Sequence, residues 1–172
     1  RLALSLLAPQ DGWILLHGAA IALQSGGWAL LVGYSNAGKS TAARAFKSFC
    51  DEWVMVQPDT AGALAASTPY WNGTPGLAKC EAILCLERDP DASCRGGFET
   101  RLQKALTTVA LQCLPSLRAV RALLPHVVRF VAREDIDRSV FANLCALTRR
   151  VPVFRALCPT GESYIQCLAQ IM

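Results

Sequence analysis

The sequence has no uninterrupted apolar stretch of the roughly 18 residues that a membrane-spanning helix needs. Polar side chains interrupt every candidate run of the 172-residue chain, namely His17, Lys39, Arg121, His126 and Arg129. Charged residues are also few, at 17%, whereas 52% of the residues are hydrophobic, so the chain is too apolar to be disordered. We therefore expect a folded protein without a membrane span and, at this length, a single domain over residues 1–172.

Histidine is scarce, with two residues, and the eight cysteines contain no C-x-x-C pair. A zinc site built from cysteine and histidine therefore has few ligands to draw on. Several cysteines lie inside apolar runs, as Cys85 does in the run 83–86. We expect buried thiols in a reducing, cytoplasmic environment rather than a zinc site or a disulfide framework.

The net charge of +4 is unevenly distributed along the chain. Residues 101–155 contain ten lysines and arginines but three acidic residues. This pattern favours a solvated helical face over a surface that binds phosphate or an acidic partner. No aromatic residues alternate with these arginines, so we expect no nucleic-acid partner.

Short apolar runs in the first half of the chain predict strands. Residues 14–23 and 28–32 are joined by the turn-like sequence 24–27 and should pair as a hairpin. Residues 53–56 and 82–86 should belong to the same sheet. Between residues 58 and 76, three prolines and three glycines predict a loop region with one short strand.

Beyond about residue 98 the spacing of apolar residues favours helices. From Glu99, positions 102, 106, 109, 110 and 113 recur at helical spacing, and positions 141, 144, 145 and 147 do so after the acidic start 134–137. Residues 151–157 predict a terminal strand, and Pro152 indicates that this strand lies at the edge of the sheet.

The most specific signal is a match to the phosphate-binding pattern G-x-x-x-x-G-K-[ST], directly after the apolar run 28–32 and before a helix-compatible stretch at 42–46. Glycines in such a loop let successive N–H groups point inward, and the helix that follows adds its positive dipole end. We expect a nucleotide polyphosphate to bind here, at Gly33, Tyr34, Ser35, Asn36, Ala37, Gly38, Lys39, Ser40 and Thr41.

Within this loop, Lys39 is expected to reach the β- and γ-phosphates, and Ser40 to offer its hydroxyl to Mg²⁺. The loop by itself leaves open whether the nucleotide is hydrolysed, serves as a switch or donates a phosphoryl group.

Two further positions are candidates for chemistry. If the helix ends near Ala45 and residues 48–50 form a returning strand, Asp51 lies beside the loop. If the helix runs on to Cys50, Asp51 lies about 16 Å away. His17 is either a core residue whose polar atoms are hydrogen-bonded or a residue near the phosphates. The second is possible because the hairpin brings its strand beside the strand that leads into the loop.

His17-Gly18, the loop 33–41 and Asp51-Glu52 together resemble the HPr kinase/phosphorylase family, whose nucleotide-binding fold is shared with phosphoenolpyruvate carboxykinases. The resemblance covers about residues 13–88, with a weaker echo at 151–157. It implies an α/β fold with a mixed P-loop sheet and flanking helices. It also implies that Asp51 takes a proton from the acceptor hydroxyl, that Glu52 stands near the metal, and that His17 stands near the transferred phosphate.

The chain departs from the family where Asn36 replaces a usual glycine and Glu52 a more common aspartate, and the family's later segment for binding a protein substrate is not found. Our first hypothesis is a divergent kinase that uses ATP and Mg²⁺ to phosphorylate a hydroxyl, in a serine of a protein or peptide or in a small molecule. The alternatives are a P-loop ATPase or GTPase and a nucleotide-binding regulatory module. A homo-oligomer is compatible with the sequence, and residues 70–75 are a candidate segment to close over substrate.

Overall fold

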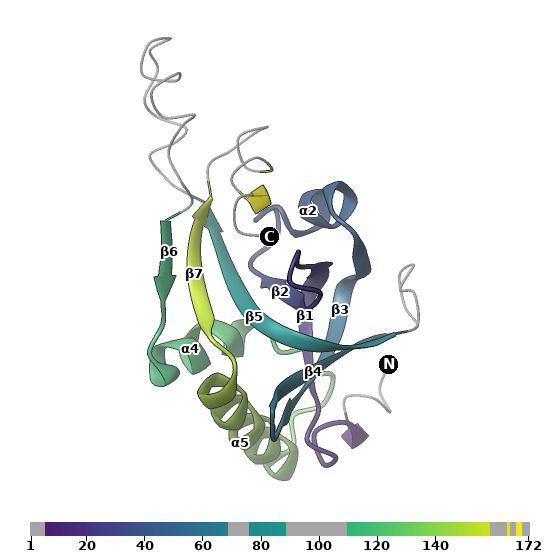
Figure 1. Cartoon of the computed structure of the whole chain (residues 1–172). Helices are drawn as coiled ribbons and strands as arrows, with labels where there is room; N and C mark the ends of the chain where they lie inside the picture. Colours follow the sequence, from purple (N-terminus) through teal and green to yellow (C-terminus); the bar gives the residue numbers. More distant parts are fainter. Residues whose placement is uncertain (1–5, 69–75, 89–109, 159–164, 166–167, 170–172) are drawn as a thin grey trace, which may run out of the picture.

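The computed structural model describes residues 6–68, 76–88, 110–158, 165 and 168–169 (Figure 1). Within these residues seven strands form one mixed sheet, accompanied by the helices α2, α4 and α5 and one short 3₁₀ helix. The elements are β1 (Ile14–Ala22), β2 (Trp28–Val32), α2 (Lys39–Ala45), β3 (Ser48–Asp59), β4 (Gly62–Ser67), β5 (Leu77–Arg88), β6 (Ala110–Cys113), α4 (Ser116–Leu123), the 3₁₀ helix η2 (Leu124–His126), α5 (Glu134–Arg150) and β7 (Val153–Cys158). The predicted α/β class, a mixed sheet with flanking helices, is confirmed.

The predicted hairpin at the start of the chain is confirmed. β1 and β2 pair antiparallel, from Gly18 opposite Val32 to Ala22 opposite Trp28. A Cβ atom at Gly18 would lie 2.6 Å from the carbonyl oxygen of Leu31, closer than two such atoms approach. Glycine at this position therefore lets the two strands meet closely at the point where β2 leads into residues 33–41. We call these residues, which carry the phosphate-binding pattern, the phosphate loop.

The sheet closes on itself through the long strand β5. β1 also pairs antiparallel with β3, β3 with β4, and β4 with the first part of β5. β2 then pairs parallel with the middle of β5, so that β2, β1, β3, β4 and β5 form a ring. The second half of β5 carries β7 in parallel, and β6 follows β7 at the outside. The ring holds the strands around the loop in a fixed register.

Hydrophobic residues are buried on both faces of the sheet, which explains why the strands appear in the sequence as continuous apolar runs. Along β1, Leu16 and Ala20 join the core cluster that includes residues of α4 and α5, while Ala19 and Ile21 join the cluster that includes residues of α2. The helices are separated accordingly in Figure 1, with α4 and α5 at one end of the sheet and α2 at the other. We call the surface of the sheet that packs against α2, with Ala19 and Ile21, the α2 face.

Two of the expectations for regular structure need correction. The predicted loop region 58–76 is more regular than expected, because β3 continues through Pro58 to Asp59 and β4 occupies 62–67 as the one short strand. The helical pattern expected to reach Cys113 is wrong at Ala110 and Cys113, which belong to β6. Pairing with β7 overrides the helical spacing there. The earlier positions of that pattern, 102–109, lie outside the described residues, as do residues 70–75.

The helix predicted after the acidic segment is confirmed as α5, which begins at Glu134 and carries Arg149 and Arg150 in its last turn. Negative charges in the first turn and positive charges in the last turn are favourable, because the helix dipole is positive at its N-terminus and negative at its C-terminus. The terminal strand is confirmed as β7, but its predicted edge position is wrong, because β6 pairs with its outer side. Pro152 lies just before the strand, where its carbonyl accepts a hydrogen bond from Ile83 N–H at 3.0 Å and no N–H is required of it.

Five cysteines whose side chains the structure describes are free thiols, namely Cys50, Cys80, Cys85, Cys113 and Cys145. Cys50, Cys80 and Cys85 are buried in the core, as expected, whereas Cys113 is exposed and Cys145 is partly exposed. Among the described helices none is long and apolar enough to cross a membrane.

Candidate active site at the phosphate loop

The segment between β2 and α2 makes a tight turn over the end of the sheet. Asn36 and Gly38 both have positive φ angles, of 65° and 104°. Asparagine is among the few non-glycine residues that adopt such a conformation readily, which explains how this loop manages without a glycine at position 36. A Cβ atom at Gly33 would lie 2.8 Å from the carbonyl oxygen of Leu86, so the start of the loop packs directly on β5.

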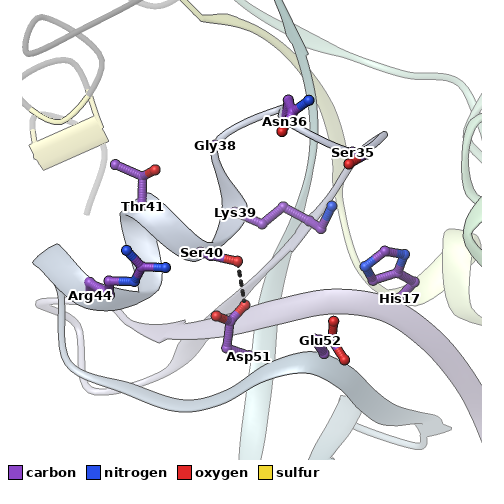
Figure 2. A pocket seen from close by; sticks show the side chains of 10 residues that line it. All are labelled: His17, Ser35, Asn36, Gly38, Lys39, Ser40, Thr41, Arg44, Asp51 and Glu52. Atoms are coloured by element: carbon purple, nitrogen blue, oxygen red, sulfur yellow. Dashed lines mark hydrogen bonds between the residues drawn. The ribbon is translucent and has the colours of Figure 1, made fainter. Parts of the chain in front are cut away.

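Lys39 is buried, and its side chain turns back over the loop (Figure 2). Its Nζ donates hydrogen bonds to the carbonyl oxygens of Gly33, at 2.7 Å, and Tyr34, at 3.2 Å. Burial lowers the pKa of Lys39, and the nearby carboxylates of Asp51 and Glu52 oppose that shift. The ammonium group is thus held at the loop by two weak neutral acceptors that an anionic phosphate oxygen can replace.

The helix after the loop is short, and this brings Asp51 to the loop. α2 ends at Ala45, Phe46 is already extended, and β3 begins at Ser48, whose hydroxyl donates to the Ala43 carbonyl at 2.8 Å. Of the two possibilities that the sequence left open, the structure shows the short helix with a returning strand and excludes a helix that continues to Cys50. As a result, the Ser40 hydroxyl donates a hydrogen bond to Asp51 Oδ1 at 3.2 Å (Figure 2).

Glu52 lines the same pocket as Asp51 although the two are consecutive in a strand. Asp51 is opposite Ala19, whose side chain belongs to the α2 face, so regular alternation would send Glu52 to the other face. Glu52 has a φ of 100°, which glutamate rarely adopts, and its partner on β1 is Gly18, which has no side chain. The unfavourable backbone angle thus accompanies the placement of a second carboxylate in the pocket.

His17 lies on the α2 face of β1 and also lines the pocket. It is only partly buried, and it is not a member of either core cluster. Burial and the positive charge of Lys39 lower its pKa, while Glu52 and Asp51 act in the opposite direction. Of the two interpretations of His17 that the sequence left open, its position agrees with the one near the loop.

These side chains surround a pocket of about 370 Å³, a size in the lower range for small-molecule sites. It contains two basic side chains, of Lys39 and Arg44, and the two carboxylates, so it combines anion-binding and proton- or metal-binding groups. Six of the nine predicted loop residues line it, whereas Gly33, Tyr34 and Ala37 do not. The full lining is His17, Ser35, Asn36, Gly38, Lys39, Ser40, Thr41, Arg44, Asp51 and Glu52.

Ser40, Asp51 and Glu52 line the pocket with oxygen-bearing side chains, the ligand type that could hold a magnesium ion. Mg²⁺ prefers oxygen ligands and is commonly held by one or two carboxylates together with substrate phosphates. In the part of the chain that the structure describes, no group of three or more His, Cys, Asp and Glu side chains is arranged to hold a metal by itself. The donor set therefore suits a metal whose remaining ligands are phosphate oxygens and water.

One residue at this site was not anticipated from the sequence. His126, at the end of η2, is 8% exposed, and its ring packs edge-on against that of Tyr34, with 5.2 Å between the ring centroids. Burial lowers its pKa, and the positive charges of Lys39 and His17 lower it further. Nothing in the residues around position 126 indicates a contact with the loop, because His126 and Tyr34 are more than half the chain apart in the sequence.

No family model and no curated protein sequence matches this chain. Among solved structures, one with a similar course of the chain is the Hpr(Ser) kinase/phosphatase from Coxiella burnetii. The two are 7% identical, the alignment covers 91% of this chain and 96% of that one, and the TM-score is 0.47. At this level of similarity the function of the chain has to be inferred from its own residues.

Proposed function

We propose that this protein is a kinase that transfers the γ-phosphoryl group of ATP to a hydroxyl, in a serine of a protein or peptide or in a small molecule. The observation that supports this most is the contact of Ser40 with Asp51 beside the buried ammonium group of Lys39. It puts a carboxylate next to the place where a phosphate loop holds the phosphates of a nucleotide.

In the proposed reaction the loop and the first turn of α2 bind the phosphates through backbone N–H groups. Lys39 exchanges its hydrogen bonds to the Gly33 and Tyr34 carbonyls for bonds to phosphate oxygens. The acceptor oxygen forms a bond to the γ-phosphorus as the bond from that phosphorus to the bridging oxygen of ADP breaks.

Asp51 accepts the proton that the acceptor hydroxyl loses, and ADP leaves with the bridging oxygen. A carboxylate acting as general base typically contributes about 10²- to 10⁴-fold to the rate. Ser40 and Glu52 would hold Mg²⁺, which screens the negative charge of the phosphates when it is bound. His17 stands at the Lys39 end of the pocket, near the expected position of the transferred group.

A second function is favoured by the same hydrogen bond. In P-loop NTPases the loop serine or threonine and a nearby aspartate hold the magnesium ion together. The Ser40–Asp51 contact matches that arrangement as well, in which case Asp51 serves the metal and water takes the place of the acceptor. The product is then free phosphate rather than a phosphorylated acceptor.

Incubation of the protein with γ-labelled ATP, Mg²⁺ and an extract of the source cells separates these functions. A kinase transfers the label to an acceptor, and Asp51→Asn abolishes the transfer while ATP still binds. Asp59→Asn, at the far end of the same strand, is the matched control and should leave transfer intact. Release of labelled phosphate without a labelled acceptor would contradict the kinase proposal and support the hydrolase, and binding without turnover would contradict both.

A further inference from the structure

The segment that follows η2 completes the edge of β1 under the phosphate loop. β2 pairs with β1 only from Gly18 onward, because beyond Val32 the chain leaves the sheet to form the loop. At the position that β2 vacates, Val127 forms a bridge with Leu16, and Val128 N–H donates to the Leu15 carbonyl at 2.8 Å. Val127 and Val128, more than a hundred residues from β1 in the sequence, thus fill the space beside the loop.

This arrangement places His126 directly against the outer turn of the loop. The Tyr34 ring is 70% exposed and does not line the pocket, but it packs on the ring of the buried His126, with an angle of 67° between the two planes. Edge-to-face pairs of aromatic rings are favourable beyond the area they bury. In this contact, a rigid, buried ring supports a side chain that otherwise faces solvent.

The backbone of Tyr34 connects this contact to the phosphate-binding groups. Its carbonyl oxygen accepts hydrogen bonds from Ala37 N–H, at 3.1 Å, and from Lys39 Nζ, at 3.2 Å. When a phosphate takes over Lys39, the second of these bonds is lost. The ring contact with His126 does not depend on Lys39 and persists through that exchange.

We propose that His126 is a positioning residue for the phosphate loop. It anchors the Tyr34 ring, and through the Tyr34 backbone it keeps the loop in the conformation that accepts a polyphosphate. The inference rests on the proposed nucleotide binding at this site. It assigns to the C-terminal half of the chain a part in nucleotide affinity, although the motif itself lies entirely in the first half.

The test compares His126→Ala, which removes the ring, with His126→Phe, which keeps a ring of similar shape. Titration with Mg·ATP should show an affinity about threefold to tenfold weaker for the alanine variant and near the wild-type value for the phenylalanine variant. Tyr34→Leu, at an exposed position that does not endanger folding, should weaken affinity by a similar factor. The double variant His126→Ala/Tyr34→Leu should be no weaker than either single variant, because one contact is removed in all three.

A second measurement needs no nucleotide. Amide hydrogen exchange in residues 33–38 should be faster in His126→Ala and Tyr34→Leu than in His126→Phe and the wild type, whereas a purely structural role would change only the overall stability. Equal exchange in all four proteins, or affinity losses that add in the double variant, would overturn the inference. If the wild type binds no Mg·ATP, the proposed function fails, and the exchange rates alone decide the role of His126.

Discussion

Ser40 and Asp51, eleven positions apart, are joined by a hydrogen bond of 3.2 Å between the serine hydroxyl and Oδ1 of the carboxylate. The contact exists because α2 ends at Ala45 and β3 returns from Ser48. A single additional turn of helix would carry Asp51 about 5 Å further from the loop. The chemistry proposed for this site therefore depends on the length of one short helix.

Asp51→Asn should lower the rate of phosphoryl transfer by about 10²- to 10⁴-fold, because an amide of the same shape cannot take the acceptor proton. It can still accept the hydrogen bond from Ser40, so ATP binding should persist. Rates of transfer from labelled ATP and titration of the nucleotide measure the two effects. A loss of Mg²⁺-dependent binding in parallel with the rate would instead assign Asp51 to the metal.

Lys39→Met should weaken ATP binding by about tenfold to a hundredfold, since it removes a buried cation that forms charge-assisted hydrogen bonds to phosphate. Methionine has a similar length and leaves the apolar part of the side chain in place. Lys47→Met, at an exposed position after α2, removes the same charge outside the pocket and is the control. Equal losses for the two variants would indicate a general effect of net charge rather than a phosphate site.

Glu52→Gly and Glu52→Ala should differ in stability although both remove the carboxylate. Glycine adopts the φ of 100° without strain, whereas alanine does not, so the glycine variant should be more stable than the alanine variant by about 1 kcal/mol. Denaturant unfolding measures the difference. Both variants should lose phosphoryl transfer if the carboxylate acts in the site, and equal stability of the two would show that the backbone at position 52 is unstrained in solution.

Protonation of His126 should destabilise the fold. Its pKa is lowered from the ordinary 6.5 by burial, then by Lys39 and His17, so below pH 6.5 the unfolded chain binds this proton more readily than the folded one. The free energy of unfolding should therefore be fully retained above pH 6.5 and should fall as the pH drops through the lowered pKa. His126→Phe should flatten the part of this dependence that lies below pH 6.5. Parallel curves for the two proteins would contradict the expectation.

The described thiols should differ in reactivity. Burial raises the pKa of Cys50, Cys80 and Cys85 to about 12, which lowers their thiolate fraction about a thousandfold from that of an ordinary thiol. Alkylation of the folded protein with iodoacetamide should modify Cys113, which is exposed, before these three. Peptide mass spectrometry resolves the sites, and unfolding should equalise the rates. Rapid modification of Cys50 in the folded protein would show that β3 opens readily.

The local features of the site were predictable because they depend on residues close together in the sequence. The phosphate-binding pattern, the strand before it and the presence of a helix after it follow from glycine positions and apolar spacing over about twenty residues, whereas the length of that helix was left open. The hairpin of β1 and β2 was predictable for the same reason, and it brings His17 toward the loop. The positions of Lys39 and Ser40 follow from these elements, that of Asp51 was decided by the end of α2 at Ala45, and the proposed roles of all three remain predictions.

Pairing between distant strands decided what local patterns left open. β6 is a strand despite its helical spacing, because it covers the outer side of β7, and β7 for the same reason is no edge. Glu52 enters the pocket through a backbone angle that no residue pattern announces. His126 reaches the loop because the segment after η2 takes the place that β2 leaves on β1. Sequence by itself thus determined the strand, loop and helix around residues 33–41, whereas the position of the second carboxylate and the contact of His126 with Tyr34 arise only when the whole sheet closes.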